Sequence, residues 1–252
     1  MALSSETERK LRLLNLSELI SIIDDMERLP ESYNLTFDEK MDMAIDSLYS
    51  LRMDKKIKSS MKRAGFKWPD AEISSMFFLP ERQLNKETFL QLSNCVFIET
   101  AMNIVIYGPT GDGKSYAACA IGKAACKKCK RVKYIRFPDL CEEIAMLEHP
   151  WERAKILKKY INYDLLIIDE WLNKEVTDSD VSFMFDLVDA RECKAPIIFC
   201  SQYRSTEWLP RLGGGPKAES IVDKFVYDAL EIEFNDFNMR DYMARENPKK
   251  WC

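Results

Sequence analysis

A single histidine, His149, occurs in the 252 residues, and no apolar run approaches the ~18 residues that a membrane-spanning helix needs. The opening segment 1–9 also lacks the apolar core of a signal peptide. We therefore expect a cytoplasmic protein without membrane contact. The 8 cysteines are scattered through predicted helices and strands, so reduced thiols are expected. Cys126 and Cys129 have the spacing of half a zinc site, but no second pair completes it.

The most informative stretch is a glycine-rich loop. Its residues are Gly108, Pro109, Thr110, Gly111, Asp112, Gly113, Lys114 and Ser115. They fit the pattern G-x-x-x-x-G-K-[ST], with an apolar run at 104–107 before them and a small-residue segment at 116–125 after them. This strand-loop-helix context distinguishes a P-loop from a glycine-rich turn that happens to carry a lysine.

A P-loop suits the phosphates of a nucleotide for physical reasons. Glycines lack Cβ atoms, so successive backbone N–H groups can turn toward a triphosphate, and the next helix directs its positive dipole end there. Lys114 is predicted to contact the β and γ oxygens, and Ser115 to place its hydroxyl on a bridging Mg²⁺ ion. The sequence thus predicts ATP and Mg²⁺ as cofactors, in a site that extends to Tyr116.

A second motif is predicted to complete this site. Residues 163–170 form an almost continuous apolar run, as in a strand buried on both faces, that ends in Asp169 and Glu170. Alone, such an acidic pair is more typical of a strand that ends in solvent. Together with the P-loop it predicts the Walker B element of a hydrolytic NTPase, with Asp169 behind the metal ion and Glu170 beside the attacking water.

The first part of the chain is predicted to be helical. Apolar residues recur at helical spacing from about Lys10 to Met26, which predicts one amphipathic helix. Thr36, with Glu39 three positions on, has the capping-box pattern that begins a second helix. This second helix is expected to extend to about Ala64.

The second helix carries a stripe of positive charge. Its members recur every three or four residues and so share one face: Arg52, Lys55, Lys58 and Lys62. A solvated face is one interpretation. Contact with the phosphates of DNA is the other, because cations gather here although the net charge of the chain is −4. Such contacts would position the protein without reading base sequence.

We predict three parts of the chain: a helical domain at 1–68, a connecting segment at 69–102 and a nucleotide-binding core at 103–252. Near the end of the connecting segment, 94–98 either packs in the core or lies against the adenine of the nucleotide. In the core, strands alternate with helices, which indicates a parallel sheet. The predicted strands are 132–137, 163–170, 196–200 and 230–234, and the predicted helices include 138–147, 151–161 and 218–229.

In a parallel sheet, ligand groups gather at the carboxyl ends of the strands. Asp169 and Glu170 end one predicted strand, and Ser201 and Gln202 end another. These side chains are therefore expected near the P-loop.

Together these motifs resemble the IstB-like ATPases, the transposition helpers of bacterial insertion sequences, which are similar to DnaC-type helicase loaders within the AAA+ class. The resemblance covers nearly the whole chain. Besides the P-loop and the Walker B run, it includes 97–107, 116–118, 122–125, 137–140, 201–202, 207–208, 221–224 and 238–240. This ordered set is far more specific than a P-loop alone.

The resemblance implies an α/β fold of the AAA+ P-loop NTPase type: a parallel sheet flanked by helices, with a small helical domain before it. Because little follows Arg240, we expect no C-terminal lid domain. It implies an ATPase that binds double-stranded DNA, forms a homo-oligomer with ATP and DNA, and works with the transposase of the same element. By position, Ser201 or Gln202 corresponds to the sensor-one residue and Arg240 to a sensor-two-like arginine.

One position departs from the family pattern. Relatives usually have an arginine at the position of Lys224, where it is a candidate finger that reaches into a neighbouring subunit's site. Lysine keeps the charge but loses the planar fork that grips phosphate oxygens. Either hydrolysis in trans is weaker here, or Arg211 does that work.

Two other functions stay open on the sequence alone. A DnaC-like helicase loader would use the nucleotide as a switch and a replicative helicase as its partner. A small-molecule kinase would need an arginine-rich lid and an acceptor pocket, which the sequence does not show, and it has little use for Glu170.

Overall fold

The computed structural model describes residues 3–227 and 229–246. The chain divides into two compact units, Met1–Ser59 and Ser60–Cys252. The division falls within helix α3 (Phe37–Ala64). The domain limits predicted at residues 68 and 102 stay a prediction.

The first unit contains two short helices where the sequence predicted one. They are α1 (Ser5–Leu13) and α2 (Ser17–Glu27), and the single helix predicted from Lys10 to Met26 is wrong. Asn15 adopts a left-handed φ of 57°, a conformation that a short polar side chain tolerates. The N–H of Leu16 bonds to the carbonyl of Leu11, and this Schellman-type closure ends α1.

The capping box predicted at the start of α3 is confirmed. The backbone N–H and the hydroxyl of Thr36 donate to the Glu39 carboxylate at 2.7 and 2.8 Å. Before it, η1 (Pro30–Asn34) links α2 to α3. Leu19, Ala44 and Leu48 form the small buried core of this unit.

The second unit begins with irregular chain and short helices. These are η2 (Ile73–Ser75), η3 (Pro80–Arg82), α4 (Lys86–Ser93) and α5 (Val96–Glu99). Phe97 and Ile98 on α5 are buried in the core of the unit and do not line the cavity described below. Of the two interpretations of 94–98, core packing is therefore the one that the fold supports.

A parallel sheet of five strands organises the second unit, as predicted. Its strands are β1 (Ile104–Tyr107), β2 (Val132–Arg136), β3 (Leu165–Trp171), β4 (Ile197–Ser201) and β5 (Leu230–Glu233). Their order in space is β2-β3-β4-β1-β5, and every neighbouring pair is parallel.

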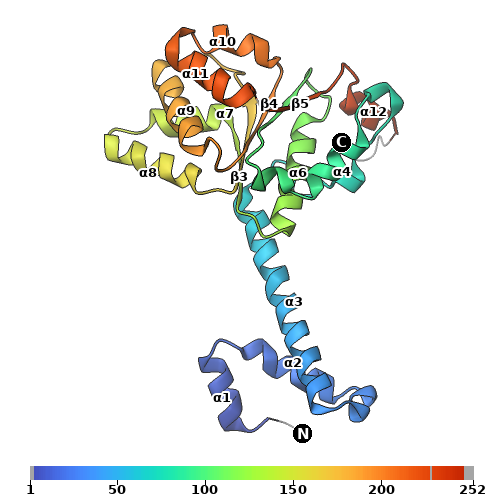
Figure 1. Cartoon of the computed structure of the whole chain (residues 1–252). Coiled ribbons are helices and arrows are strands. Elements are labelled where there is room, and N and C mark those ends of the chain that lie inside the picture. Colours follow the sequence, from blue (N-terminus) through green and yellow to red (C-terminus); the bar gives the residue numbers. More distant parts are fainter. Residues whose placement is uncertain (1–2, 228, 247–252) are drawn as a thin grey trace. The chain divides into compact units, whose positions relative to one another are not determined.

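Helices cover both faces of this sheet, on either side of the strands in Figure 1. Alternate strand residues serve the two layers: Ile104 and Ile106 pack on the side of α6 (Lys114–Lys127), whereas Val105 packs on the other side. That second side carries α7 (Phe137–Ala145), α8 (Pro150–Ile161), α9 (Asp178–Arg191) and α11 (Gly215–Val226).

Helix α11 begins earlier than predicted. The sequence predicted a helix at 218–229, but the helix starts at Gly215 because Pro216 has the fixed φ that suits a first turn. Residue 228 lies outside the described residues. The remaining elements are η4 (Ser205–Glu207), α10 (Trp208–Arg211) and α12 (Met239–Glu246). None of the helices in the described part of the chain combines the length and apolar composition of a membrane span.

Candidate nucleotide site

A cavity of about 800 Å³ lies at the carboxyl edge of the sheet. The P-loop forms one wall, and segments from 67–82, β3, β4 and α12 form the rest. The cavity brings together most of the site residues predicted from the sequence: Thr110, Gly111, Asp112, Gly113, Lys114, Ser115, Tyr116, Asp169, Glu170, Ser201, Gln202 and Arg240. Lys224 and Arg211 do not line it, nor do Gly108 and Pro109, which begin the loop.

The P-loop needs glycine at two positions for different reasons. At Gly108 a Cβ atom would lie 2.1 Å from the carbonyl oxygen of Phe234, so only glycine lets the two segments approach. Gly113 has a φ of 102°, a conformation that side chains rarely adopt, and immediately precedes α6. The chain thus turns sharply enough for the first turn of α6 to face the cavity.

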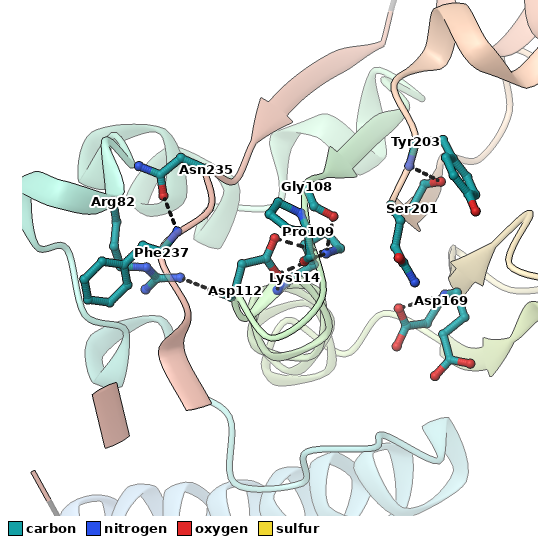
Figure 2. A network of polar contacts seen from close by, with 12 residues as sticks. Arg82, Gly108, Pro109, Asp112, Lys114, Asp169, Ser201, Tyr203, Asn235 and Phe237 are labelled. Atoms are coloured by element: carbon teal, nitrogen blue, oxygen red, sulfur yellow. Dashed lines mark hydrogen bonds and ion pairs between the residues drawn. The ribbon is translucent and has the colours of Figure 1, made fainter. Parts of the chain in front are cut away.

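The Lys114 ammonium lies folded back on its own loop (Figure 2). It donates to the carbonyls of Gly108, at 2.6 Å, and Pro109, and it forms an ion pair with Asp112 at 3.0 Å. Burial raises the pKa of Asp112 even though Lys114 lies beside it, because desolvation outweighs the ion pair. These contacts hold the lysine within reach of any phosphate bound in the loop.

Arg82 is bonded to the backbone of the P-loop, and sequence reasoning missed it. Its guanidinium donates to the carbonyl of Asp112 at 2.6 Å (Figure 2). It also donates to the carbonyl of Phe77 at 2.6 Å and lies over the Phe234 ring. The side chain is 4% exposed, and burial lowers its pKa. A lone arginine in a connecting segment carries no sequence signal of this role.

The two acidic residues at the end of β3 lie on the same side of the sheet because the strand is irregular there. The pairing with β4 shifts register between Ile168 and Trp171, so two residues occupy the space of one. Glu170 takes a φ of 57°, a costly conformation for a residue with a side chain. As a result both carboxylates line the cavity instead of pointing to opposite faces.

Each of these carboxylates is held by a residue of β2. The hydroxyl of Tyr134 donates to Asp169, and the Arg136 guanidinium lies 2.7 Å from Glu170. Lys67 lies 3.3 Å from the other oxygen of Glu170. Arg136 first, and Lys67 with it, lowers the pKa of Glu170. Glu170 is therefore ionised and restrained.

Ser201 and Gln202 end β4 in different environments. The buried Ser201 hydroxyl donates to the Trp171 carbonyl at 3.0 Å. It accepts from the N–H of Tyr203 at 3.1 Å (Figure 2). Gln202 is exposed and donates its amide to Asn173 at 3.2 Å. Ser201 is thus engaged with the backbone, whereas Gln202 has a side chain that can turn toward a ligand.

Apolar and aromatic side chains also line the cavity, and the sequence did not indicate most of them. Side chains from three segments line it: Trp68, Met76, Phe77, Tyr116, Met239 and Met243. The Trp68 and Tyr116 rings lie 6.4 Å apart, and Phe77 packs edge-on against Tyr242. Such surfaces suit a flat heteroaromatic ring, and exposed Arg240 lines the same cavity.

The family model described as IstB-like ATP binding protein matches residues 9–247. The chain belongs to this family. The resemblance inferred from the ordered motifs is therefore confirmed.

Its relatives are encoded by insertion sequences. The putative insertion sequence ATP-binding protein y4pL of Sinorhizobium fredii is 25% identical over 97% of this chain and 100% of its own length. The putative ATP-binding protein of insertion sequence IS232 from Bacillus thuringiensis is 27% identical over 94% of this chain and 95% of its own.

Solved structures of the same fold include replication proteins. The DnaC helicase loader is 20% identical, with a TM-score of 0.54, over 66% of this chain and 97% of its own. DnaA from Aquifex aeolicus, bound to AMPPCP, is also 20% identical, with a TM-score of 0.57, over 72% of this chain and 56% of its own. At this identity the likeness shows the fold alone, and it confirms the predicted AAA+ architecture.

The two candidate finger residues of this IstB-like protein differ in their contacts. Lys224 is engaged with Asp189 and, at 2.8 Å, with Glu192, and the hydrogen bond to Asp189 is the main reason that its pKa is raised. Arg211 lies over the Tyr203 ring, 3.2 Å from its centroid, and has no ion pair within the described residues.

The basic stripe on α3 is partly neutralised. Within the first unit, Lys55 lies 3.0 Å and Arg52 lies 3.4 Å from the carboxylate of Glu18, and Arg52 also donates to the Asn15 carbonyl. Lys58 is exposed and has no ion pair among residues 3–227 and 229–246. Lys62, in the second unit, is likewise exposed.

Proposed function

We propose that this IstB-like protein is a Mg²⁺-dependent ATPase that binds double-stranded DNA and assists a transposase. The observation that carries the ATPase proposal is the convergence of a P-loop lysine and a pair of strand-end carboxylates on one cavity. Lys114, Asp169 and Glu170 all line that cavity.

The donor atoms at the cavity fit a magnesium ion. The Ser115 hydroxyl and the Asp169 carboxylate line it together, and Mg²⁺ prefers oxygen ligands of this kind. When bound, the ion would neutralise charge on the phosphate oxygens. Ser115 and Asp169 are the residues that would hold it.

Residues of the chain itself would bind the phosphates and activate the water. Lys114 would exchange its contact with Asp112 for the β and γ oxygens of ATP, which offer a stronger negative charge. Glu170 would accept a proton from the attacking water, and Gln202, in preference to Ser201, would contact the γ-phosphate. Arg240 would add positive charge at the open side of the cavity.

The apolar side chains that line the cavity would receive the adenine ring. Trp68, Phe77 and Tyr116 offer flat surfaces at its edge, and Met76 fills an irregular gap well. This assignment replaces residues 94–98, of which Cys95, Phe97 and Ile98 are buried in the core.

A second subunit is proposed to complete the site. Arg211 lacks an acidic partner among the described residues, whereas Lys224 is engaged with two carboxylates. Releasing Lys224 would break both ion pairs, so Arg211 is the better candidate for a cation delivered to a neighbouring nucleotide. ATP and DNA would both favour such a homo-oligomer.

The transposition role rests on the family and on the similarity to insertion sequence ATP-binding proteins. Insertion sequences move by the action of a transposase, so that enzyme is the proposed partner. A helicase-loading role is the alternative, supported by the shared fold of the DnaC helicase loader. The family match favours transposition because it extends over residues 9–247.

A co-sedimentation experiment tests this proposal. The protein is mixed with a random-sequence duplex and ATP, and the transposase encoded beside it is added. We expect the transposase to be retained only when both ATP and DNA are present. Retention of a replicative helicase in place of the transposase would instead support the loader.

A further inference from the structure

The contact between Tyr134 and Asp169 has no counterpart in the P-loop or Walker B patterns. Tyr134 is 5% exposed and Asp169 is 2% exposed, and the tyrosine hydroxyl donates to Oδ2 of the carboxylate. A buried carboxylate without hydrogen-bond donors is strongly unfavourable. Tyr134 can therefore determine the orientation of the Asp169 carboxylate.

The geometry leaves Asp169 with acceptor capacity toward the cavity. Its Oδ2 accepts from Tyr134, and its Oδ1 accepts from the backbone N–H of Glu170 at 2.9 Å. An ionised carboxylate has about four lone-pair sites, so two donors fix its orientation and leave roughly two sites free. Because Asp169 lines the cavity, those sites are available to a ligand there.

The position of the Tyr134 hydroxyl is itself fixed by packing. The ring belongs to the core cluster that joins the sheet to α6, with Ile167 and Cys119. In the sheet register Tyr134 pairs with Ile167, two residues before Asp169, so the length of the tyrosine side chain lets its hydroxyl reach the carboxylate. A phenylalanine would fill the same space and lack only the donor.

We propose that Tyr134 is a positioning residue for metal binding: its hydroxyl orients Asp169 so that the free lone pairs of the carboxylate face the ion bound with the nucleotide. This inference rests on the proposed ATPase function. Partners of metal-ligating carboxylates commonly change metal affinity by ~10- to 100-fold when removed. If the hydroxyl had only a structural role, its removal would lower the stability of the fold and leave the Mg²⁺ dependence of nucleotide binding unchanged.

Another tyrosine supplies a matched control. Tyr160 is fully buried, and its hydroxyl also donates to a carboxylate, that of Glu143, which does not line the cavity. Tyr134→Phe and Tyr160→Phe thus remove the same kind of hydrogen bond and keep the ring. Thermal unfolding without nucleotide gives the structural cost of each change.

The experiment measures the dissociation constant of a fluorescent ATP analogue for the full chain, once with EDTA and once with Mg²⁺. The ratio of the two constants reports the contribution of the metal. For Tyr134→Phe we expect a ratio about tenfold smaller than in the parent, with binding in EDTA unchanged. For Tyr160→Phe we expect the parent ratio.

A double-mutant cycle with Asp169→Asn tests whether the two residues act together. Asp169→Asn should reduce the ratio by itself, and adding Tyr134→Phe should change it no further. Equal ratios in Tyr134→Phe and the parent would overturn the inference while leaving the ATPase proposal intact. If the nucleotide affinity of the parent protein did not depend on Mg²⁺, both the inference about Tyr134 and the proposal of a Mg²⁺-dependent ATPase would be overturned.

Discussion

The Arg136 guanidinium lies 2.7 Å from the carboxylate of Glu170, the residue proposed to take a proton from water. Lys67 lies 3.3 Å from the same carboxylate, so the proposed base is held between two cations. A base that is restrained in this way has a low pKa and accepts a proton poorly. We therefore predict that turnover requires Glu170 to leave these partners.

Arg136→Ala should release Glu170 and raise the rate of ATP hydrolysis in the absence of DNA by about fivefold, the effect of a partly exposed ion pair of ~1 kcal/mol. Because Arg136 lowers the pKa of Glu170, its removal should also move the acid limb of the pH–rate profile to higher pH. Arg131→Ala is the control, since Arg131 forms an ion pair with Asp164 at 2.7 Å at the opposite end of the same two strands. A profile unchanged by Arg136→Ala would argue against the restraint.

Arg82→Ala should weaken ATP binding because it removes the donors that hold the Asp112 and Phe77 carbonyls. We expect a loss of about tenfold or more in affinity, as hydrogen bonds to charged groups contribute ~1.5–3 kcal/mol. Arg191→Ala is the comparison: Arg191 is also buried and donates to carbonyls, including those of Tyr160 and Pro196, away from the cavity. Isothermal calorimetry should show a loss of ATP affinity for Arg82→Ala and none for Arg191→Ala. Equal losses in the two variants would mean that Arg82 only stabilises the fold.

Binding of the basic stripe to DNA should be limited by Glu18. Glu18→Gln should free Arg52 and Lys55, raise affinity for unrelated duplexes alike and steepen the salt dependence. Lys58→Ala should flatten the log–log salt slope by ~0.9, the value for one phosphate contact. Fluorescence anisotropy over a salt series measures both slopes. If neither variant changes the slope, the stripe is a solvated face.

ATP hydrolysis should depend on a neighbouring subunit. Lys114→Ala subunits, which lack nucleotide but keep Arg211, should partly restore activity when mixed with Arg211→Ala subunits. An arginine finger contributes ~10³-fold or more in rate, so the recovery should be easily measured. Lys224→Ala in place of Arg211→Ala is the matched comparison and should keep most of its activity alone. Activity of the parent that is strictly proportional to protein concentration would contradict a shared site.

The P-loop and the Walker B acids could be predicted because each is a continuous run with its own strand or helix. The residues that contact the P-loop and these acids could not be predicted in this way. Tyr134, Arg136 and Arg82 are separated from the acids and the P-loop by about thirty residues of chain, and only the strand pairing and the packing of the connecting segment bring them together. Periodicity also misled at Asn15, where the apolar pattern continues across a left-handed residue that ends the helix.

The register shift near the end of β3 could not be predicted from the sequence either. Strand alternation places Asp169 and Glu170 on opposite faces, and the register shift beside them cancels that alternation. The prediction that both reach the nucleotide depended on the Walker B pattern and on their place at the carboxyl end of a strand, rather than on strand alternation. The apolar lining of the cavity was missed because Trp68, Phe77 and Met239 come from segments with no common pattern.

The most direct test of the ATPase proposal compares Lys114→Ala and Glu170→Gln in paired measurements of ATP binding and ATP hydrolysis. Lys114→Ala should lose binding, because the loop loses its movable cation. Glu170→Gln should bind ATP as the parent does and lose turnover by ~10²-fold or more, because an amide cannot accept a proton from water. Hydrolysis by Glu170→Gln at the parent rate would contradict the proposed role of this carboxylate.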